Sequence, residues 1–174
     1  MPEEVILVDE EDREIGKMEK IRAHQEGRLH RAFSIFIFSP DGRMLIQKRA
    51  KEKYHCGGLW ANACCSHPRP GETLEEAVHR RLKEELGFDT ELKEAFHFIY
   101  RATFPNGLTE HEFDHVFIGF YSGPVQPNKE EVEEIKWVAP EEILEDMRKN
   151  PERYTPWFRI ALEKVLEKTK EFNH

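Results

Sequence analysis

Apolar residues alternate with polar ones, or run together, in several short segments rich in Val, Ile and Phe. Both patterns are typical of half-buried or buried β-strands. They predict strands at residues 5–9, 31–50, 95–104, 113–122 and 133–139. The 31–50 segment is interrupted by the sequence SPDG, in which Pro40 fixes φ and Asp41 and Gly42 suit a tight turn. We therefore expect this segment to fold as a β-hairpin.

The clearest helix covers residues 71–88, where apolar residues recur with the period of an α-helix. Thr73 and Glu76 have the spacing of a capping box at its start, and Gly87 is a natural C-terminal stop. The apolar stripe, which is expected to face the core, consists of Leu74, Ala77, Val78, Leu82 and Leu86.

Two more helices are predicted near the C-terminus. Residues 140–150 begin with a proline at a first-turn position, and residues 156–170 form an amphipathic pattern. Strands and helices are mixed along the chain without a regular βαβ alternation. This order predicts an α+β fold, or an α/β fold with a mixed sheet flanked by helices.

The composition indicates one folded domain, residues 1–174, of a length that buries a real core. Hydrophobic residues make up 39% of the chain, which excludes a chain disordered by composition. The net charge of −8 argues against a nucleic-acid partner, but leaves room for a local basic pocket. No apolar run approaches the roughly 18 residues that span a bilayer, and no secretory signal is recognisable. We expect no membrane association and a cytoplasmic location.

The three cysteines are expected to be free thiols. Cys64 and Cys65 are neighbours, and adjacent cysteines rarely form a good disulfide. Cys56 adds no C-x-x-C repeat, so a structural zinc site is not expected either.

Arg81 and Glu85 border the apolar stripe of the 71–88 helix. An i,i+4 ion pair on the rim of the stripe is the simple explanation. The surrounding residues also resemble the Nudix box, G-x5-E-x7-R-E-U-x-E-E-x-G-U, where U is a bulky apolar residue. Aligned from Ser66, the matching residues are Glu72, Arg80, Leu82, Glu84, Glu85, Gly87 and Phe88.

Two positions depart from that box: Ser66 replaces its first glycine, and Arg81 replaces the glutamate after its arginine. Nudix hydrolases use this glutamate at their metal site, whereas an arginine cannot ligate a cation. It can grip a phosphate with two hydrogen bonds. The helix therefore resembles a Nudix scaffold whose hydrolytic site has become a phosphate clamp.

A second group of candidates combines carboxylates with histidines. In an extended strand Glu110, Glu112 and Asp114 point to one face, where they suit a shared cation or form an exposed acidic strand end. The histidine candidates are His24, His30 and His67, the last on the same side as Cys65 if that segment is extended. Mixed imidazole and carboxylate ligands suit Mn, Zn or Fe better than Mg.

Five segments occur in the order expected for type I isopentenyl-diphosphate isomerases: RLHRAFSIFIF, LWANACCSHP, GETLEEAVHRRLKEELG, YRATFPNGLTEHE and TPWF. The resemblance covers residues 5–165. It implies a Nudix-like α/β/α sandwich that interconverts isopentenyl and dimethylallyl diphosphate. No G-x-G-x-x-G or other flavin signal appears, so no flavin is expected.

The resemblance also implies roles for individual residues. Four are implied in catalysis: Cys65, Glu112, Tyr100 and Trp157. The implied ligands of a Mn²⁺ or Zn²⁺ ion are His24, His30, His67, Glu110 and Glu112. An Mg²⁺ ion that reaches the diphosphate is implied at Glu85 and the backbone carbonyl of Cys65. The implied diphosphate-binding cations are Lys20, Arg49, Lys53 and Arg81.

The reaction adds a proton at one carbon and removes another two carbons away. A thiol and a carboxyl on either side of the substrate can do this, and the indole of Trp157 can stabilise the tertiary carbocation between the two steps. The sequence leaves open whether Cys65 or Glu112 gives the first proton; we favour Glu112, through Tyr100, with Cys65 as the base.

Three other functions stay open from the sequence. A Nudix hydrolase would release phosphate, but Arg81 argues against it. A binding module that has lost hydrolysis would not need Cys65 and Glu112. An acidic domain with incidental histidines would bind no tight metal. The partner we expect is a small molecule, and the largely polar helix faces favour a monomer.

Overall fold

The computed structural model describes residues 3–51, 53 and 56–172, which form one nine-stranded sheet and four α-helices. The strands are β1 (Glu4–Val8), β2 (Glu14–Glu19), β3 (His30–Phe38), β4 (Met44–Arg49), β5 (Trp60–Ala61), β6 (Cys64–Ser66), β7 (Leu92–Thr103), β8 (Thr109–Phe120) and β9 (Val132–Val138). The helices are α1 (Lys20–Glu26), α2 (Leu74–Leu86), α3 (Pro140–Lys149) and α4 (Pro156–Phe172), with a 3-10 turn at Pro151–Arg153.

Strand β3 is the centre of the sheet. Along one edge, the whole length of β3 pairs in parallel with β8, from the pair His30–Glu112 to the pair Phe38–Phe120. The other edge is shared by three antiparallel strands in turn: β1, β6 and β4. Strand β7 pairs antiparallel with β8. The sheet is therefore mixed, and the start of β3 lies beside the acidic part of β8.

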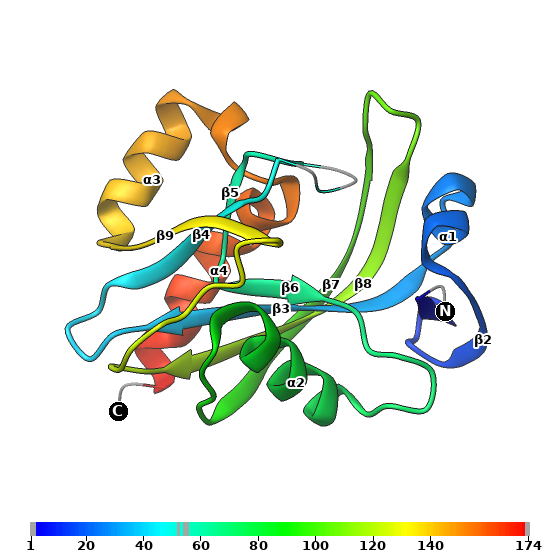
Figure 1. Ribbon diagram of the computed structural model, residues 1–174, viewed down its shortest axis with the longest axis horizontal. Coiled ribbons are helices and arrows are strands. Elements are labelled where there is room, and N and C mark those ends of the chain that lie inside the picture. Colours follow the sequence, from blue (N-terminus) through cyan, green and yellow to red (C-terminus); the bar gives the residue numbers. More distant parts are fainter. Residues whose placement is uncertain (1–2, 52, 54–55, 173–174) are drawn as a thin grey trace.

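Alternate residues of β3 face two separate hydrophobic cores. Phe36 and Phe38 pack in the cluster that contains Trp157 and Phe158 of α4, whereas Phe33 and Ile35 pack with the buried side of α2. Figure 1 shows α2 and α4 on opposite faces of the sheet. The period of two along a strand thus produces the α/β/α sandwich, and the predicted α+β class is confirmed.

Helix α2 begins and ends as its sequence predicts. Thr73 and Glu76 form both hydrogen bonds of a capping box. Gly87 closes the helix with φ of 71°, in the left-handed region that favours glycine, and a Cβ there would lie 3.0 Å from Gln126. Both ends of the helix are fixed, so its charged edge has a defined position next to β6.

Replacing Thr73 by alanine is expected to lower the free energy of unfolding by about 1 kcal/mol, because the backbone N–H of Glu76 loses its acceptor. Urea denaturation followed by circular dichroism measures this difference. Thr73→Ser keeps the hydroxyl and is the matched control. An alanine variant as stable as the serine variant would contradict the role of the cap.

Sequence periodicity missed the shortest and most exposed elements. The 31–50 hairpin is confirmed, but its strands pair only at Ile37–Leu45 and Phe38–Met44, and most of β4 pairs with β9. Strand β2 is largely exposed, so it has no apolar alternation to detect. Helix α1 has seven residues, and β5 and β6 have two and three, which is too short for a period to appear.

The cysteines Cys56, Cys64 and Cys65 are free. None of the helices in the described part of the chain combines the length and the apolar character needed to cross a bilayer.

Candidate active site

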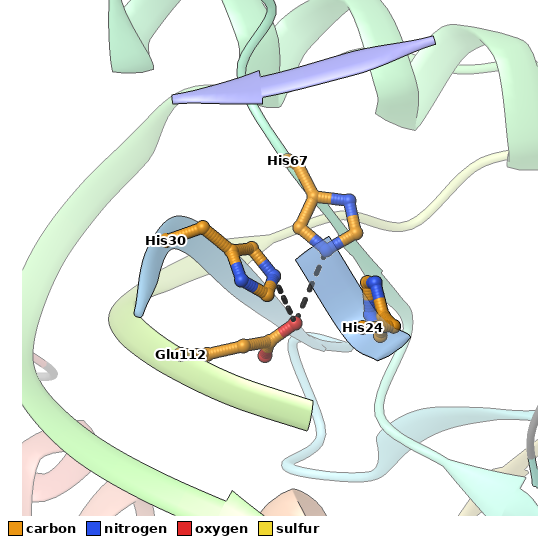
Figure 2. Close-up of side chains that lie close together, drawn as sticks. All are labelled: His24, His30, His67 and Glu112. Atoms are coloured by element: carbon orange, nitrogen blue, oxygen red, sulfur yellow. Dashed lines mark hydrogen bonds and ion pairs between the residues drawn. The ribbon is translucent and has the colours of Figure 1, made fainter. Parts of the chain in front are cut away.

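Three histidines and a glutamate from four segments meet at the start of β3. His24 comes from α1, His30 from β3, His67 from the residue after β6, and Glu112 from β8. One ligand atom of each lies within 4.8 Å of the others, and all four side chains are buried. Figure 2 shows the three rings gathered around the carboxylate of Glu112. Four of the five predicted ligands of the transition-metal site are thus brought together.

Backbone carbonyls fix the orientation of two imidazoles. Nδ1 of His24 lies 2.7 Å from the carbonyl oxygen of Lys20, and Nδ1 of His30 lies 3.0 Å from that of Arg28. A carbonyl only accepts, so we assign the ring protons to Nδ1 and the lone pairs of Nε2 to the cluster. Such a contact behind a histidine is the usual support of a metal ligand.

The protonation states suit a cation. Burial, with the neighbouring histidines, lowers the pKa of His67 to about 4, so its ring is neutral near neutral pH. Burial would raise the pKa of Glu112, but its contacts with His30 and His67 outweigh this and lower it. Nε2 of His67 and of His30 lie 3.1 and 3.5 Å from Oε2 of Glu112. Imidazole nitrogens that face a carboxylate at these distances fit a divalent transition-type ion.

Glu110, the fifth predicted ligand, lies at the edge of this group. Its Oε2 is 3.7 Å from Nε2 of His24, and the side chain is buried. Burial would lower the pKa of His24, but the Glu110 carboxylate and the Lys20 carbonyl raise it overall.

A small cavity of about 30 Å³ adjoins the cluster. Its lining residues are Arg49, Cys65, Ser66, His67, Glu110, Glu112 and Trp157. The cavity therefore joins the thiol of Cys65 to the carboxylate of Glu112. Burial raises the pKa of Cys65 despite the nearby Arg49, whose Nη1 is 3.6 Å from Sγ, so the thiol keeps its proton.

Aromatic side chains close this part of the site. The indole N–H of Trp157 donates to Oδ1 of Asn62 at 3.0 Å, and the guanidinium of Arg49 lies 5.2 Å from the centre of the indole ring. The ring of Tyr100 on β7 is 6.4 Å from that of Trp157. The Tyr100 hydroxyl is buried without a hydrogen-bond partner among the described residues, although Tyr100 does not line the small cavity.

A larger cavity of about 620 Å³ opens beside the small one, with which it shares Arg49, Cys65, Ser66 and His67. Three carboxylates line this cavity, but basic side chains outnumber them. The seven basic residues are Lys17, Lys20, Arg49, Lys53, Arg69, Arg80 and Arg81. An excess of cations in a chain of net charge −8 marks a site for a polyanion. All four predicted diphosphate-binding residues belong to this set, which we call the basic cavity.

Arg81 connects helix α2 to the basic cavity. Its Nη2 lies 3.0 Å from Oε2 of Glu85, so the ion pair expected from the i,i+4 spacing is present. The same nitrogen is 2.7 Å from Glu131, and Nη1 is 2.7 Å from Glu84. Arg81 also lines the cavity, as a phosphate clamp requires.

Glu85 is buried behind Arg81, outside the histidine cluster. The Cys64 thiol donates to its Oε2 at 2.9 Å, and the amide of Gln47 donates to its Oε1 at 3.3 Å. These contacts hold a carboxylate beside a cation of the basic cavity. The role of Glu85 as a Mg²⁺ ligand stays a prediction.

Sequence reasoning assigned no role to Asn62, Gln47 or Glu131. Asn62 stands between two alanines in the motif WANACC, and a polar residue in so apolar a setting is a usable signal. Its amide also donates to the carbonyls of Ile35 and Cys64, which fixes the strand that carries Cys65. Glu131 lies in an acidic run and carries no such signal.

Comparison with known proteins agrees with this arrangement. The family model of the NUDIX domain matches residues 28–158. The crystal structure of DR0079 from Deinococcus radiodurans has the same fold, with a TM-score of 0.78 at 21% identity over 93% of this chain and 98% of that one. Fold and sequence thus define a NUDIX-domain protein.

The relatives narrow the family further. Isopentenyl-diphosphate Delta-isomerase 2 of Aromatoleum aromaticum is 52% identical over 95% of this chain and 88% of its own length. Isopentenyl-diphosphate Delta-isomerase of Burkholderia multivorans is also 52% identical, over 95% of this chain and 94% of its own. The chain belongs to the isopentenyl-diphosphate Delta-isomerase family, as its sequence motifs predicted.

Proposed function

We propose that this protein interconverts isopentenyl diphosphate and dimethylallyl diphosphate. The observation that carries the proposal is the small cavity between Cys65 and Glu112, which adjoins the basic cavity. A diphosphate suits the larger cavity, and the short hydrocarbon would extend toward the thiol and the carboxylate. The names of the two relatives point to the same substrate.

The chemistry needs one proton donor and one proton acceptor. Protonation of the terminal carbon of isopentenyl diphosphate forms a tertiary carbocation at the neighbouring carbon. Loss of a proton from the next carbon along forms dimethylallyl diphosphate, so one proton enters and one leaves. Two such groups lining one small cavity suit this exchange, and a site that excludes water would protect the cation.

For the order of the two proton transfers we propose the one that matches the charges of the free site. Burial favours the neutral thiol of Cys65, and the histidines favour the carboxylate of Glu112. These directions support Cys65 as donor to isopentenyl diphosphate and Glu112 as acceptor. They reverse the order that we favoured from the sequence, in which Glu112 acts first through Tyr100.

Trp157 would stabilise the carbocation through the face of its indole. Its hydrogen bond to Asn62 fixes the ring in the wall of the cavity. Trp157→Leu is expected to lower kcat by about 30-fold, since a desolvated cation–π contact contributes about 2 kcal/mol. Trp157→Phe keeps an aromatic face and is the control. Steady-state kinetics in which both variants lose kcat equally would contradict this role.

Divalent ions are part of the proposal. The donor set of His24, His30, His67 and Glu112 fits Mn²⁺ or Zn²⁺, with Glu110 beside it. An ion bound there supplies positive charge that holds Glu112 in position and lowers its proton affinity. Glu85 and the backbone carbonyl of Cys65 would hold Mg²⁺ next to the diphosphate.

The diphosphate would be bound by Lys20, Arg49, Lys53 and Arg81. These residues line the basic cavity, and their charges would orient the hydrocarbon toward Cys65 and oppose departure of the diphosphate from the allylic product. We further propose that the protein acts as a cytoplasmic monomer of one domain. Light scattering after gel filtration tests the monomer.

Phosphorus and proton NMR together test the proposed function. Metal-loaded protein with isopentenyl diphosphate is expected to produce dimethylallyl diphosphate, with the diphosphate signals retained. Release of phosphate or pyrophosphate from an unrearranged substrate would overturn the proposal in favour of a hydrolase. If metal-loaded protein binds the substrate but leaves it unchanged, the protein is a binding module and not an isomerase.

A further inference from the structure

Carboxylates inside the basic cavity already pair with its cations. Glu3 lies 2.9 Å from Lys20, and Glu4 lies 3.7 Å from Lys17. Glu131 contacts two cations at once, Lys53 and Arg81. Each carboxylate that lines the cavity is therefore an internal counter-ion in a place suited to a polyanion.

Glu131 is the most closely bound of these carboxylates. Its Oε1 accepts hydrogen bonds from Nη2 of Arg81 at 2.7 Å and from Nζ of Lys53 at 3.3 Å. Arg81 and Lys53 are two of the four residues expected to bind the diphosphate. One oxygen of Glu131 therefore occupies the position between two cations that a phosphate oxygen would take.

The backbone holds Glu131 in this place. Its carbonyl accepts a hydrogen bond from the N–H of Ala50, and its own N–H donates to the carbonyl of Asn128, both at 3.0 Å. The ladder between β4 and β9 shifts register between Lys48 and Arg49, next to this contact. The carboxylate therefore belongs to the wall of the cavity, and its side chain is only 23% exposed.

Glu131 is also ionised in the free protein. Burial would raise the pKa of this carboxyl, but Arg81 and Lys53 outweigh burial and lower it. A charged carboxylate within hydrogen-bond distance of the binding cations repels an incoming anion and competes for the same donors.

We propose that Glu131 is a counter-charge that limits the affinity of the basic cavity for diphosphates. The inference depends on the proposed function for the identity of its ligand. Substrate and product carry the same diphosphate group, so a cavity that bound it too tightly would retain the product. Glu131 would weaken binding of both and thereby permit turnover.

Glu131→Gln tests the inference, because glutamine keeps the size and an oxygen that accepts from Arg81 but removes the charge. The variant is expected to bind inorganic pyrophosphate about tenfold more tightly than the natural protein. The KM for isopentenyl diphosphate should fall with it, and kcat should not rise because release of the product becomes slower. A carboxylate that merely positioned Arg81 and Lys53 predicts the opposite sign, weaker binding.

Isothermal titration with inorganic pyrophosphate, without divalent ions, measures the binding. Glu130→Gln is the matched control: it changes the net charge equally at the exposed neighbouring residue. The inference would be overturned if Glu131→Gln bound pyrophosphate no more tightly than the natural protein. It would also be overturned if Glu130→Gln tightened binding as much as Glu131→Gln does. If Glu131→Gln fails to fold, Glu131→Asp is measured in its place. This variant keeps the charge, so its affinity for pyrophosphate should stay within about twofold of the natural value. Tenfold tighter binding by Glu131→Asp would also overturn the inference.

The binding measurement is independent of turnover. If the natural protein binds pyrophosphate but does not isomerise the substrate, the proposed function is wrong. The role of Glu131 as a counter-charge is then still tested by the pyrophosphate affinity of Glu131→Gln. An active isomerase in which Glu131→Gln does not tighten binding would remove the counter-charge alone.

Discussion

Cys65→Ala is expected to lower kcat for the isomerisation by about 1,000-fold, while KM changes little. Cys65 lines the small cavity together with Glu112, so removal of its thiol would delete one of the two proposed proton-transfer groups. The proposed diphosphate-binding residues should stay in place, because the Cys65 sulfur contributes a single long hydrogen bond, at 3.6 Å, to Arg49. A radiolabel or NMR assay of product formation at saturating substrate measures kcat.

Cys56→Ala is the matched control for this variant. It removes another free thiol, whose pKa burial raises to about 12, from outside both cavities of the site. The control should retain kcat within about twofold of the natural protein. A Cys65→Ala protein of comparable activity would show that the thiol is not a proton-transfer group.

The second large effect is expected from His67→Ala. Mutation of a residue behind a metal ligand already costs about 10- to 100-fold in affinity, so loss of a ligand itself should exceed that range. His67 also contacts Glu112 at 3.1 Å, so the carboxylate loses a partner as well as the ion. We expect the variant to be purified without the divalent ion that we propose for the natural protein, and to be inactive.

Elemental analysis and titration with Mn²⁺ or Zn²⁺ measure this loss. His97→Ala, which removes an exposed histidine, is the control and should bind the ion like the natural protein. Added ion should also stabilise the natural protein, which should then unfold at a higher temperature. An ion concentration 100 times the dissociation constant of the site adds about 2.7 kcal/mol to the free energy of unfolding. A His67→Ala protein that binds the ion with unchanged affinity would contradict the assignment of this ligand.

The long elements of the fold follow from local sequence. Helix α2 shows its period, its cap and its stop within one segment, and β3 and β8 are rich in β-branched and aromatic residues. Their pairing does not follow from local sequence. The parallel ladder between β3 and β8 joins residues about 80 positions apart, and no local pattern specifies such a contact.

The residues of the site were predicted better than their arrangement. His30, His67 and Glu112 stand in motifs of the family, whereas His24 precedes the first of these motifs and lies on a seven-residue helix without a usable period. The partners of the site were found only in three dimensions. Gln47 reaches Glu85 across 38 positions, and Glu131 reaches Arg81 across 50. Nothing near either residue in the sequence marks these contacts.

Proton exchange with solvent tests the central claim, that Cys65 and Glu112 transfer protons to and from the substrate. Metal-loaded protein is incubated with isopentenyl diphosphate in D₂O, and the product is examined by proton and deuterium NMR. We predict dimethylallyl diphosphate with deuterium in the methyl group that derives from the terminal carbon. Dimethylallyl diphosphate without solvent deuterium in that methyl group would contradict the account.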